Sequence, residues 1–188
     1  MPAREAVTAV LVEGVSDQLA VETLAARLGH DLAAEGTVVV PIGGAHAVAR
    51  TARRLGPLGD GLRLLGLVDV GEEAVCRRGL AQAGVGEASD RDGLARLGFF
   101  VCERDLEDEL LRAVGVPRAE EVLASEGDLR AFRTLQGQPA WRGRDATAQL
   151  RRFIGAGAHR KHRYGRLLAE AVDLDRVPAP LGGLLDRL

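Results

Sequence analysis

Short, mostly apolar runs alternate with longer amphipathic segments over the first 115 residues of the chain. Each run ends at a proline or an acidic residue, which is typical of a buried strand. The runs cover residues 7–12, 37–40, 64–68 and 99–102. The segments with helical spacing of apolar residues cover 16–28, 45–55, 72–83 and 105–114. This alternation predicts an α/β fold with a mainly parallel four-stranded sheet flanked by helices.

Strand signals stop beyond Pro117. Short helices are predicted over residues 120–126, 129–135, 146–154 and 164–172. The glycine-containing segment 84–92 is predicted to be a loop or short lid, and the tail with Pro178 and Pro180 an irregular strap. We therefore expect an α/β core over residues 1–115 and a helical, basic C-terminal extension over residues 116–188 that packs on it.

Length and composition set limits on the class of protein. A chain of 188 residues is long enough for one domain with a substantial core. No apolar run reaches transmembrane length and no export signal is evident, so we expect a cytoplasmic protein without a membrane partner. Two cysteines, Cys76 and Cys102, support neither a disulfide framework nor a zinc site.

The net charge of −2 hides a strong asymmetry along the chain. The segment Arg130–Arg166 contains ten basic residues and one acid, net +9, which leaves net −11 for the rest. A basic block beside an acidic, metal-binding edge suits a phosphate backbone, because the bases neutralise phosphates and the acids bind them through a cation. The alternative is a solvated, arginine-rich helix face.

Acidic residues follow three of the four predicted strands. Glu13 and Asp17 follow the first, Asp69 the third, and Glu103 and Asp105 the fourth. Carboxyl ends of parallel strands meet at one edge of a sheet, so these acids would lie together. Crowded carboxylates repel unless a divalent cation lies among them, and oxygen ligands suit Mg²⁺ or Mn²⁺. For Asp17 and Glu107, a helix-dipole interaction is the alternative explanation.

The position two residues after Asp69 is Gly71, where a second acid would share the same face. Glu72 or Glu73 could take its place from the start of the next helix, or both are ordinary first-turn acids. Glu103 and Asp105 do have that spacing, with Glu107 expected behind the ligands.

Three further residue types bear on chemistry. Gly14 would let the backbone approach a phosphate or metal closely. Lys161 is the only lysine, and its ammonium suits a point charge on a phosphoryl oxygen. Trp141 could stack on a base or anchor the packing of the extension. His46, His159 and His162 do not form a zinc set, and no Walker A sequence indicates ATP hydrolysis.

Glu13-Gly14-x-x-Asp17, Asp69 and Glu103-x-Asp105-Leu106-Glu107 resemble motifs of the Toprim domain, closest to the nuclease domain of OLD-family (overcoming lysogenisation defect) endonucleases. The resemblance covers residues 6–114 and, more weakly, the extension to residue 172. It implies a Rossmann-like Toprim fold, here without the ATPase domain of OLD proteins. Toprim domains also occur in topoisomerases, primases and ribosomal-RNA maturases, so the fold alone does not define the reaction.

The resemblance also implies site residues and one or two Mg²⁺ or Mn²⁺ ions, the number depending on the gap at Gly71. Combined with the strand-end acids, it predicts metal ligands at Glu13, Asp17, Asp69, Glu72, Glu73, Glu103 and Asp105. Glu13, Asp69 and Lys161 are the predicted catalytic residues. Together with the charge pattern, the predicted nucleic-acid contacts are Gly14, Arg151, Arg152, Arg160 and Arg163.

The sequence therefore predicts a metal-dependent DNA endonuclease. One alternative is a non-catalytic nucleic-acid-binding or regulatory subunit of a separately encoded ATPase or helicase, and another is a Toprim RNA-processing nuclease acting on RNA. A homodimer is compatible with each hypothesis. A topoisomerase is disfavoured, because Tyr164, the only tyrosine, lies in the basic segment and not among the acids.

Overall fold

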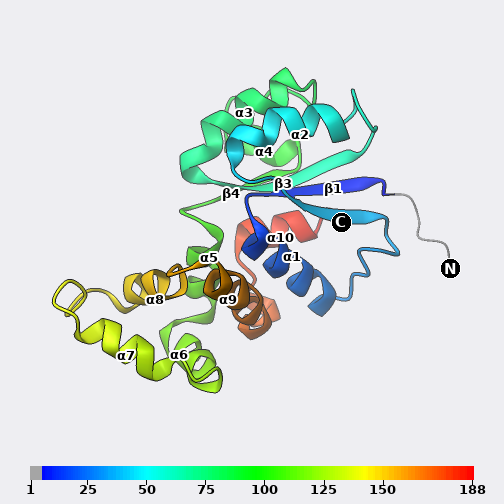
Figure 1. Cartoon of the computed structure of the whole chain (residues 1–188). Helices are drawn as coiled ribbons and strands as arrows, with labels where there is room; N and C mark the ends of the chain where they lie inside the picture. Colours follow the sequence, from blue (N-terminus) through cyan, green and yellow to red (C-terminus); the bar gives the residue numbers. More distant parts are fainter. Residues whose placement is uncertain (1–5) are drawn as a thin grey trace.

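A four-stranded parallel sheet forms the centre of the protein (Figure 1). The computed structural model describes residues 6–188, so the first five residues of the predicted core lie outside it. The strands are β1 (Thr8–Val12), β2 (Thr37–Pro41), β3 (Arg63–Asp69) and β4 (Phe99–Cys102), in the order β2-β1-β3-β4. All pairings are parallel, with Leu11 beside Val40 and Gly66. The predicted sheet is confirmed.

Alternate residues of each strand face two separate hydrophobic cores. Ala9 and Leu11 pack with the 3-10 helix η1 (Ala45–Ala47), α2 (Val48–Leu55), α3 (Glu73–Gln82) and α4 (Arg91–Arg96). Val10 and Val12 pack with α1 (Val15–Arg27), α5 (Leu106–Val114), α9 (Ala158–Ala171) and α10 (Ala179–Leu185). Figure 1 shows α2, α3 and α4 on one face and α1 and α10 on the other. Helices therefore cover both faces, as a parallel sheet requires.

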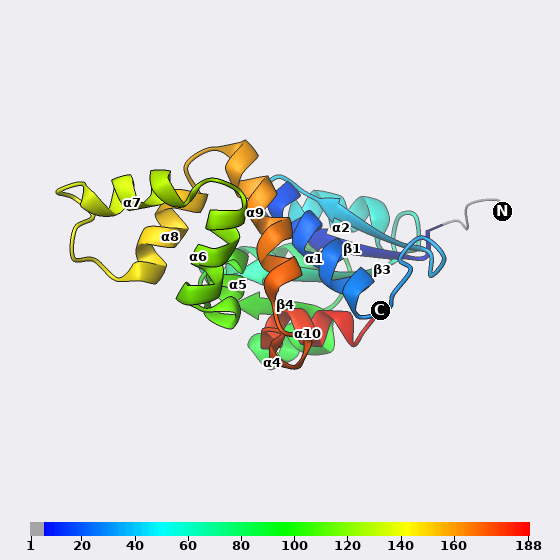
Figure 2. The same cartoon turned by 90° about the horizontal axis from the view of Figure 1, so that it is seen from below.

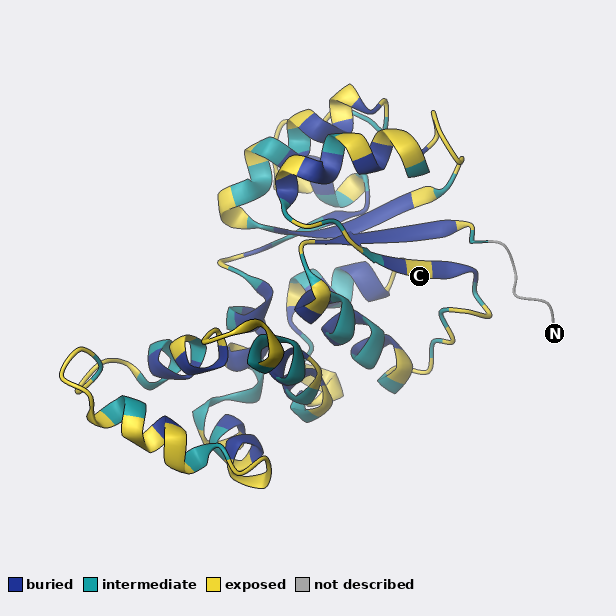
Figure 3. Ribbon diagram, viewed as in Figure 1, coloured by how far each residue is buried: buried dark blue, intermediate teal, exposed yellow. Residues whose placement is uncertain are grey.

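The extension forms a helical lobe beside the end of the sheet where the strands finish (Figures 1 and 2). It consists of α6 (Val116–Ser125), α7 (Leu129–Gly137), α8 (Ala146–Ile154) and α9. Phe132 and Phe153 meet edge-to-face at 5.5 Å in its interior, while much of α7 and the loop before α8 are exposed (Figure 3). Helix α9 runs along α1, and α6, α8 and α9 also contact α5, so the lobe is joined to the sheet layer through both helices.

The tail differs from its prediction, because it is helical and not an irregular strap. After a short 3-10 turn, η3 (Leu174–Arg176), α10 lies against β3 and β4 and buries Leu181, Leu184 and Leu185. Pro178 precedes α10 and Pro180 lies in its first turn, where a missing N–H costs no helical hydrogen bond. A Cβ at Gly183 would meet the Phe100 ring at 2.5 Å, so glycine permits this close packing.

Two other boundaries depart from the sequence pattern. Residues 84–90 lack regular structure, as expected, but α4 begins at Arg91 with Asp90 as its cap, the Asp90 carboxylate accepting the Gly93 N–H at 2.7 Å. Helix α9 begins at Ala158, six residues before the predicted start, because its first turns are polar and show no apolar spacing. None of the helices within residues 6–188 is long and apolar enough to cross a membrane.

Candidate active site

The ends of two neighbouring strands bring Glu13 and Asp69 together. Asp69 is the last residue of β3 and Glu13 directly follows β1, so neighbouring strands bring the two carboxyl groups together. Burial raises the pKa of Asp69 to about 8, and the charges of Glu13, Asp17 and Asp105 add to the shift. A bound cation would stabilise the charged form of a carboxyl group whose pKa is raised in this way.

Asp17 is the third acid of this edge. It lies in the first turn of α1, is buried, and accepts the Gly14 N–H through Oδ2 at 2.9 Å. Burial raises the pKa of Asp17 to about 6, with Glu107 adding to the shift and the Gly14 hydrogen bond opposing it. The Gly14 N–H, predicted to contact phosphate, is thus already bonded within the chain.

A glycine turn holds the end of β1 in place. The N–H groups of Gly43 and Gly44 donate to the backbone oxygen of Glu13 at 2.9 and 3.3 Å. Both glycines have positive φ, 75° and 102°, a conformation that other residues adopt only with strain. The turn after β2 therefore fixes the backbone from which the Glu13 carboxylate extends.

Lys161 reaches the acids from α9. Its Nζ forms an ion pair with Glu107 Oε1 at 3.1 Å, and the Glu107 side chain is only 9% exposed. Burial alone would lower the pKa of Lys161, but Glu107, and then Asp17 and Glu13, raise it above its usual range. Lys161 thus stays charged beside carboxylates from three elements.

Close packing of two helices places Lys161 there. A Cβ at Gly165 of α9 would lie 2.7 Å from the backbone oxygen of Ser16, at the start of α1. Lys161 lies four residues before Gly165 on the same helix face, and Asp17 directly follows Ser16. Glycine therefore allows α9 to approach the acidic N-terminal turn of α1.

Asp105 performs two structural tasks. Its Oδ1 caps α5 by accepting the Asp108 N–H at 2.9 Å, and its carboxylate forms an ion pair with Arg151 of α8. The Arg151 Nε lies 3.2 Å from Asp105 Oδ1. Asp105 is close enough to Asp69 to raise its pKa, so it belongs to the same acidic edge.

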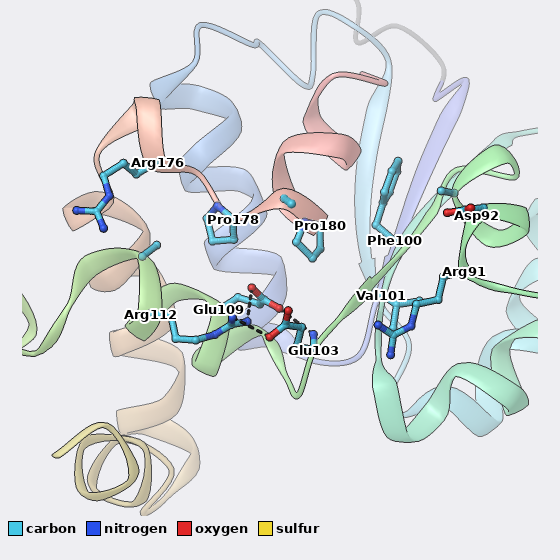
Figure 4. A pocket seen from close by; sticks show the side chains of 13 residues that line it. Arg91, Asp92, Phe100, Val101, Glu103, Glu109, Arg112, Arg176, Pro178 and Pro180 are labelled. Carbon is cyan, nitrogen blue, oxygen red and sulfur yellow. Dashed lines mark hydrogen bonds and ion pairs between the residues drawn. The ribbon is translucent and has the colours of Figure 1, made fainter. Parts of the chain in front are cut away.

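The remaining predicted ligands lie differently. Glu103 has a side chain 69% exposed that pairs with Arg112 at 2.8 Å, and Arg112 also binds Glu109 (Figure 4). This group lines a cleft below Pro178 and Pro180. Glu73 pairs with Arg91 at 3.0 Å and Arg77 at 3.9 Å. The structure therefore places Glu73 and Glu103 in arginine pairs.

The basic residues of the extension also divide into two groups. Arg160 and Arg163 both pair with Asp128, which Tyr164 also contacts through its hydroxyl at 2.9 Å. These contacts join the turn between α6 and α7 to α9. Arg151 pairs with Asp105, whereas Arg152 has no carboxylate partner within residues 6–188. Arg152 is the predicted phosphate contact with the freest guanidinium.

A family model described as overcoming lysogenization defect protein-like, TOPRIM domain, matches residues 6–61, which contain β1, α1 and β2 with Glu13 and Asp17. Residues 6–61 therefore match an OLD-like Toprim domain. The resemblance drawn from the motifs is thereby confirmed.

Solved structures extend the likeness over nearly the whole chain. The C-terminal region of the Xanthomonas campestris pv. campestris OLD protein is 27% identical with a TM-score of 0.69, over 96% of this chain and 93% of that one. The C-terminal region of the Burkholderia pseudomallei OLD protein is 22% identical with a TM-score of 0.68, over 98% and 97%, which shows the shared fold. No curated protein matches the chain. The Toprim fold class is confirmed.

Within residues 6–188, no three His, Cys, Asp or Glu side chains are arranged to hold a metal ion directly. Asp105, Glu107 and Glu103 are each bound by a basic side chain. The donor chemistry still suits a hard cation: all candidates are carboxylates, and Glu72 Oε2 is buried without a hydrogen-bond partner in the described residues. Gly71, at the Asp-x-Asp gap, borders open space.

Sequence reasoning missed a cavity of about 510 Å³ beside the acidic residues of the Toprim domain. It lies between the start of α5, α8, α9 and the loop before α8, and Asp105, Glu107 and Lys161 form part of its wall. Arg104 also lines it. The sequence indicated Trp141, Arg151, Arg152 and Lys161 one by one, but not that they line one cavity. Basic and aromatic side chains complete the cavity.

Proposed function

We propose that this Toprim domain is a divalent-cation-dependent nuclease that hydrolyses phosphodiester bonds of DNA. The observation that carries the proposal is the proximity of Glu13 and Asp69, which raises the pKa of Asp69 while neither carboxylate forms an ion pair within residues 6–188. Clustered carboxylates at the carboxyl edge of a parallel sheet are suited to phosphoryl chemistry assisted by metal ions. The OLD-like Toprim match supports a nuclease-type activity.

The residues present fit Mg²⁺ or Mn²⁺. Glu13, Asp17 and Asp69 would hold the ion with carboxylate oxygens, and Asp105 would join them once Arg151 has released it. Glu72 is a further candidate because of its unpartnered Oε2. The bound ion would activate a water molecule and stabilise the leaving oxygen.

The basic residues around the acidic edge have separate tasks in this proposal. A substrate phosphate that binds Arg151 would compete with Asp105 for the same guanidinium and free the carboxylate. Arg104 and Arg152, exposed and without a carboxylate partner in the described part of the chain, would hold neighbouring phosphates. Lys161 would place an ammonium where negative charge develops on the phosphoryl group.

The proposal is tested by nicking of supercoiled plasmid with Mg²⁺, Mn²⁺, Ca²⁺ or EDTA, beside a structured RNA substrate. We expect DNA cleavage with Mg²⁺ or Mn²⁺ and none with EDTA, with Glu13→Gln and Asp69→Asn inactive and Arg166→Ala, an exposed change on α9, active. DNA binding without cleavage under any metal would contradict the nuclease and support the regulatory subunit. Preferential cleavage of RNA would support the RNA-processing alternative.

A further inference from the structure

We propose that the cavity beside the acidic edge binds an unpaired nucleobase, with the Trp141 indole as the stacking surface. The inference rests on the proposed function, since it defines the form of the DNA substrate as single-stranded near the cleaved bond. The cavity volume of about 510 Å³ is in the range of about 300–1,000 Å³ of small-molecule sites.

Trp141 is placed by hydrogen bonds of the chain around it, and its ring lies outside both hydrophobic cores. It lies in the loop between α7 and α8, partly exposed, and its backbone oxygen accepts Gln149 Nε2 at 2.7 Å. The buried Gln149 is itself fixed by Gln136, whose Nε2 donates to Gln149 Oε1 at 2.7 Å. A tryptophan held at a cavity wall and outside the cores is a poor packing anchor, so the alternative role is disfavoured.

The side chains around Trp141 are those that a nucleotide requires. The Arg144 guanidinium lies 5.5 Å from the centre of the indole ring, and Arg104 and Arg152 line the same cavity without a carboxylate partner in residues 6–188. An aromatic ring beside unpaired arginines recognises a base and its phosphates together. An apolar ligand would leave these cations without a role, and a free phosphate would leave the indole without one.

The acidic edge forms part of the cavity wall, and this determines how a bound strand would be oriented. Asp105 and Lys161 line the cavity with Trp141, so a base stacked there would have its flanking phosphates near the acidic edge. In a duplex, the faces of a base are covered by its neighbours, so only an unpaired or extruded base can stack on a protein ring. The cavity therefore favours single strands, flaps or gaps over intact duplex.

Trp141 is the only tryptophan in the chain, so tryptophan emission, excited selectively over that of Tyr164, reports on this site alone. In EDTA, titration with a twelve-nucleotide oligothymidine should quench the Trp141 emission. A twelve-nucleotide strand with abasic sites at every position carries the same phosphates and should bind without quenching, as should a blunt duplex of equal length. Equal quenching by the oligothymidine and the abasic strand, or none by either while both bind, would overturn the proposal.

Two substitutions separate stacking from packing. Trp141→Leu should weaken oligothymidine binding roughly 5- to 150-fold, the effect of losing one aromatic–base stack, and leave abasic binding unchanged. Trp141→Phe keeps an aromatic face and should restore most of the affinity. Both variants are measured by anisotropy of labelled DNA after circular dichroism has shown folded protein. Equal affinity in Trp141→Leu and the unmodified chain would also overturn the site.

The base site and the nuclease activity can be contradicted separately. Quenching in EDTA without cleavage in any metal would support the base site and contradict the nuclease. Plasmid nicking without base-dependent quenching would support the nuclease and contradict the base site.

Discussion

The two halves of the acidic edge differ in how their charge is balanced. Glu13 and Asp69, at the ends of β1 and β3, lie near each other and form no ion pair with a basic side chain of residues 6–188, and burial and the Glu13 charge raise the pKa of Asp69 to about 8. Asp105 and Glu107, at the start of α5, pair with Arg151 and Lys161 from the helical lobe. The first half needs a proton or a cation, whereas the second half already has its cations. The lobe thus neutralises only the acids that face it.

The first half, Glu13 and Asp69 at the strand ends, is disrupted most directly by Asp69→Asn. We expect loss of cleavage by at least about 10²–10³-fold, since a ligand of the cation is removed, with unchanged or increased melting temperature in EDTA because a repelling carboxylate is gone. Nicking rates and thermal melts check both effects. A large loss of stability with normal activity per folded molecule would show that Asp69 is structural.

The second half, in which Asp105 and Glu107 pair with basic side chains, is tested by Lys161→Ala. We expect the cleavage rate at saturating DNA to fall about 10²-fold with little change in DNA affinity, because a single placed ammonium counts where charge develops. Lys161→Arg should restore the rate only in part, since a planar guanidinium does not replace a point charge. Arg166→Ala, which removes an exposed pair with Glu170 on the same helix, is the control. A loss of affinity at full maximal rate would reduce Lys161 to a phosphate contact.

The close contact between α9 and the start of α1, at Gly165 and Ser16, is tested by Gly165→Ala. The new Cβ would lie 2.7 Å from the Ser16 oxygen, so α9 must shift from α1, at a cost of about 1–3 kcal/mol of unfolding free energy. The shift should also slow cleavage by displacing Lys161. Gly182→Ala in α10, where a Cβ meets nothing within 4 Å, is the matched control and should not destabilise. Chemical denaturation in EDTA gives the unfolding free energies of both variants and of the unmodified chain. Equal stabilities of Gly165→Ala and the unmodified chain would contradict the close contact.

The pH dependence of stability should follow the strand-end half. The folded-state pKa values of Asp17 and Asp69, about 6 and about 8, lie above the ordinary value of 3.8, so folding favours their protonated forms. Their contribution is complete at low pH and is lost as pH rises through 6 and then 8. Melting temperatures in EDTA should therefore fall between about pH 4 and 8 and then level off, and Asp69→Asn should flatten the part between about 6 and 8, where only Asp69 still contributes. An unchanged slope in that variant would refute the assignment.

The smallest effect is expected from Gly71→Asp. A carboxylate there would enter open space and supply the second acid of the Asp-x-Asp motif, so Mg²⁺ should bind more tightly. Calorimetric titration of both proteins measures the change. Micromolar saturation of two sites by Mg²⁺ in the unmodified chain would show that another acid, such as Glu72, already fills the gap.

The sequence alone predicted the sheet and the acids at its edge, because apolar runs and strand-end residues are local signals, whereas the role of Lys161 stays a prediction. The sequence did not predict which acidic and basic side chains form ion pairs. The Arg151–Asp105 pair joins residues 46 positions apart, and Glu103 faces Arg112 only because α5 brings that arginine back to the end of β4. The helical tail was missed because its prolines and glycines, which suggest a loop, are tolerated in the first turn and against Phe100.

The central claim is that Glu13 and Asp69 together hold a divalent cation in place of the proton that Asp69 retains at neutral pH. Calorimetry of Mn²⁺ binding at pH 7, in buffers with different ionisation enthalpies, counts the protons released per ion. We expect about one proton in the unmodified chain and close to none in Asp69→Asn, because the pKa of Asp69 is raised to about 8. Binding without proton release, or equal release from both proteins, would contradict the account.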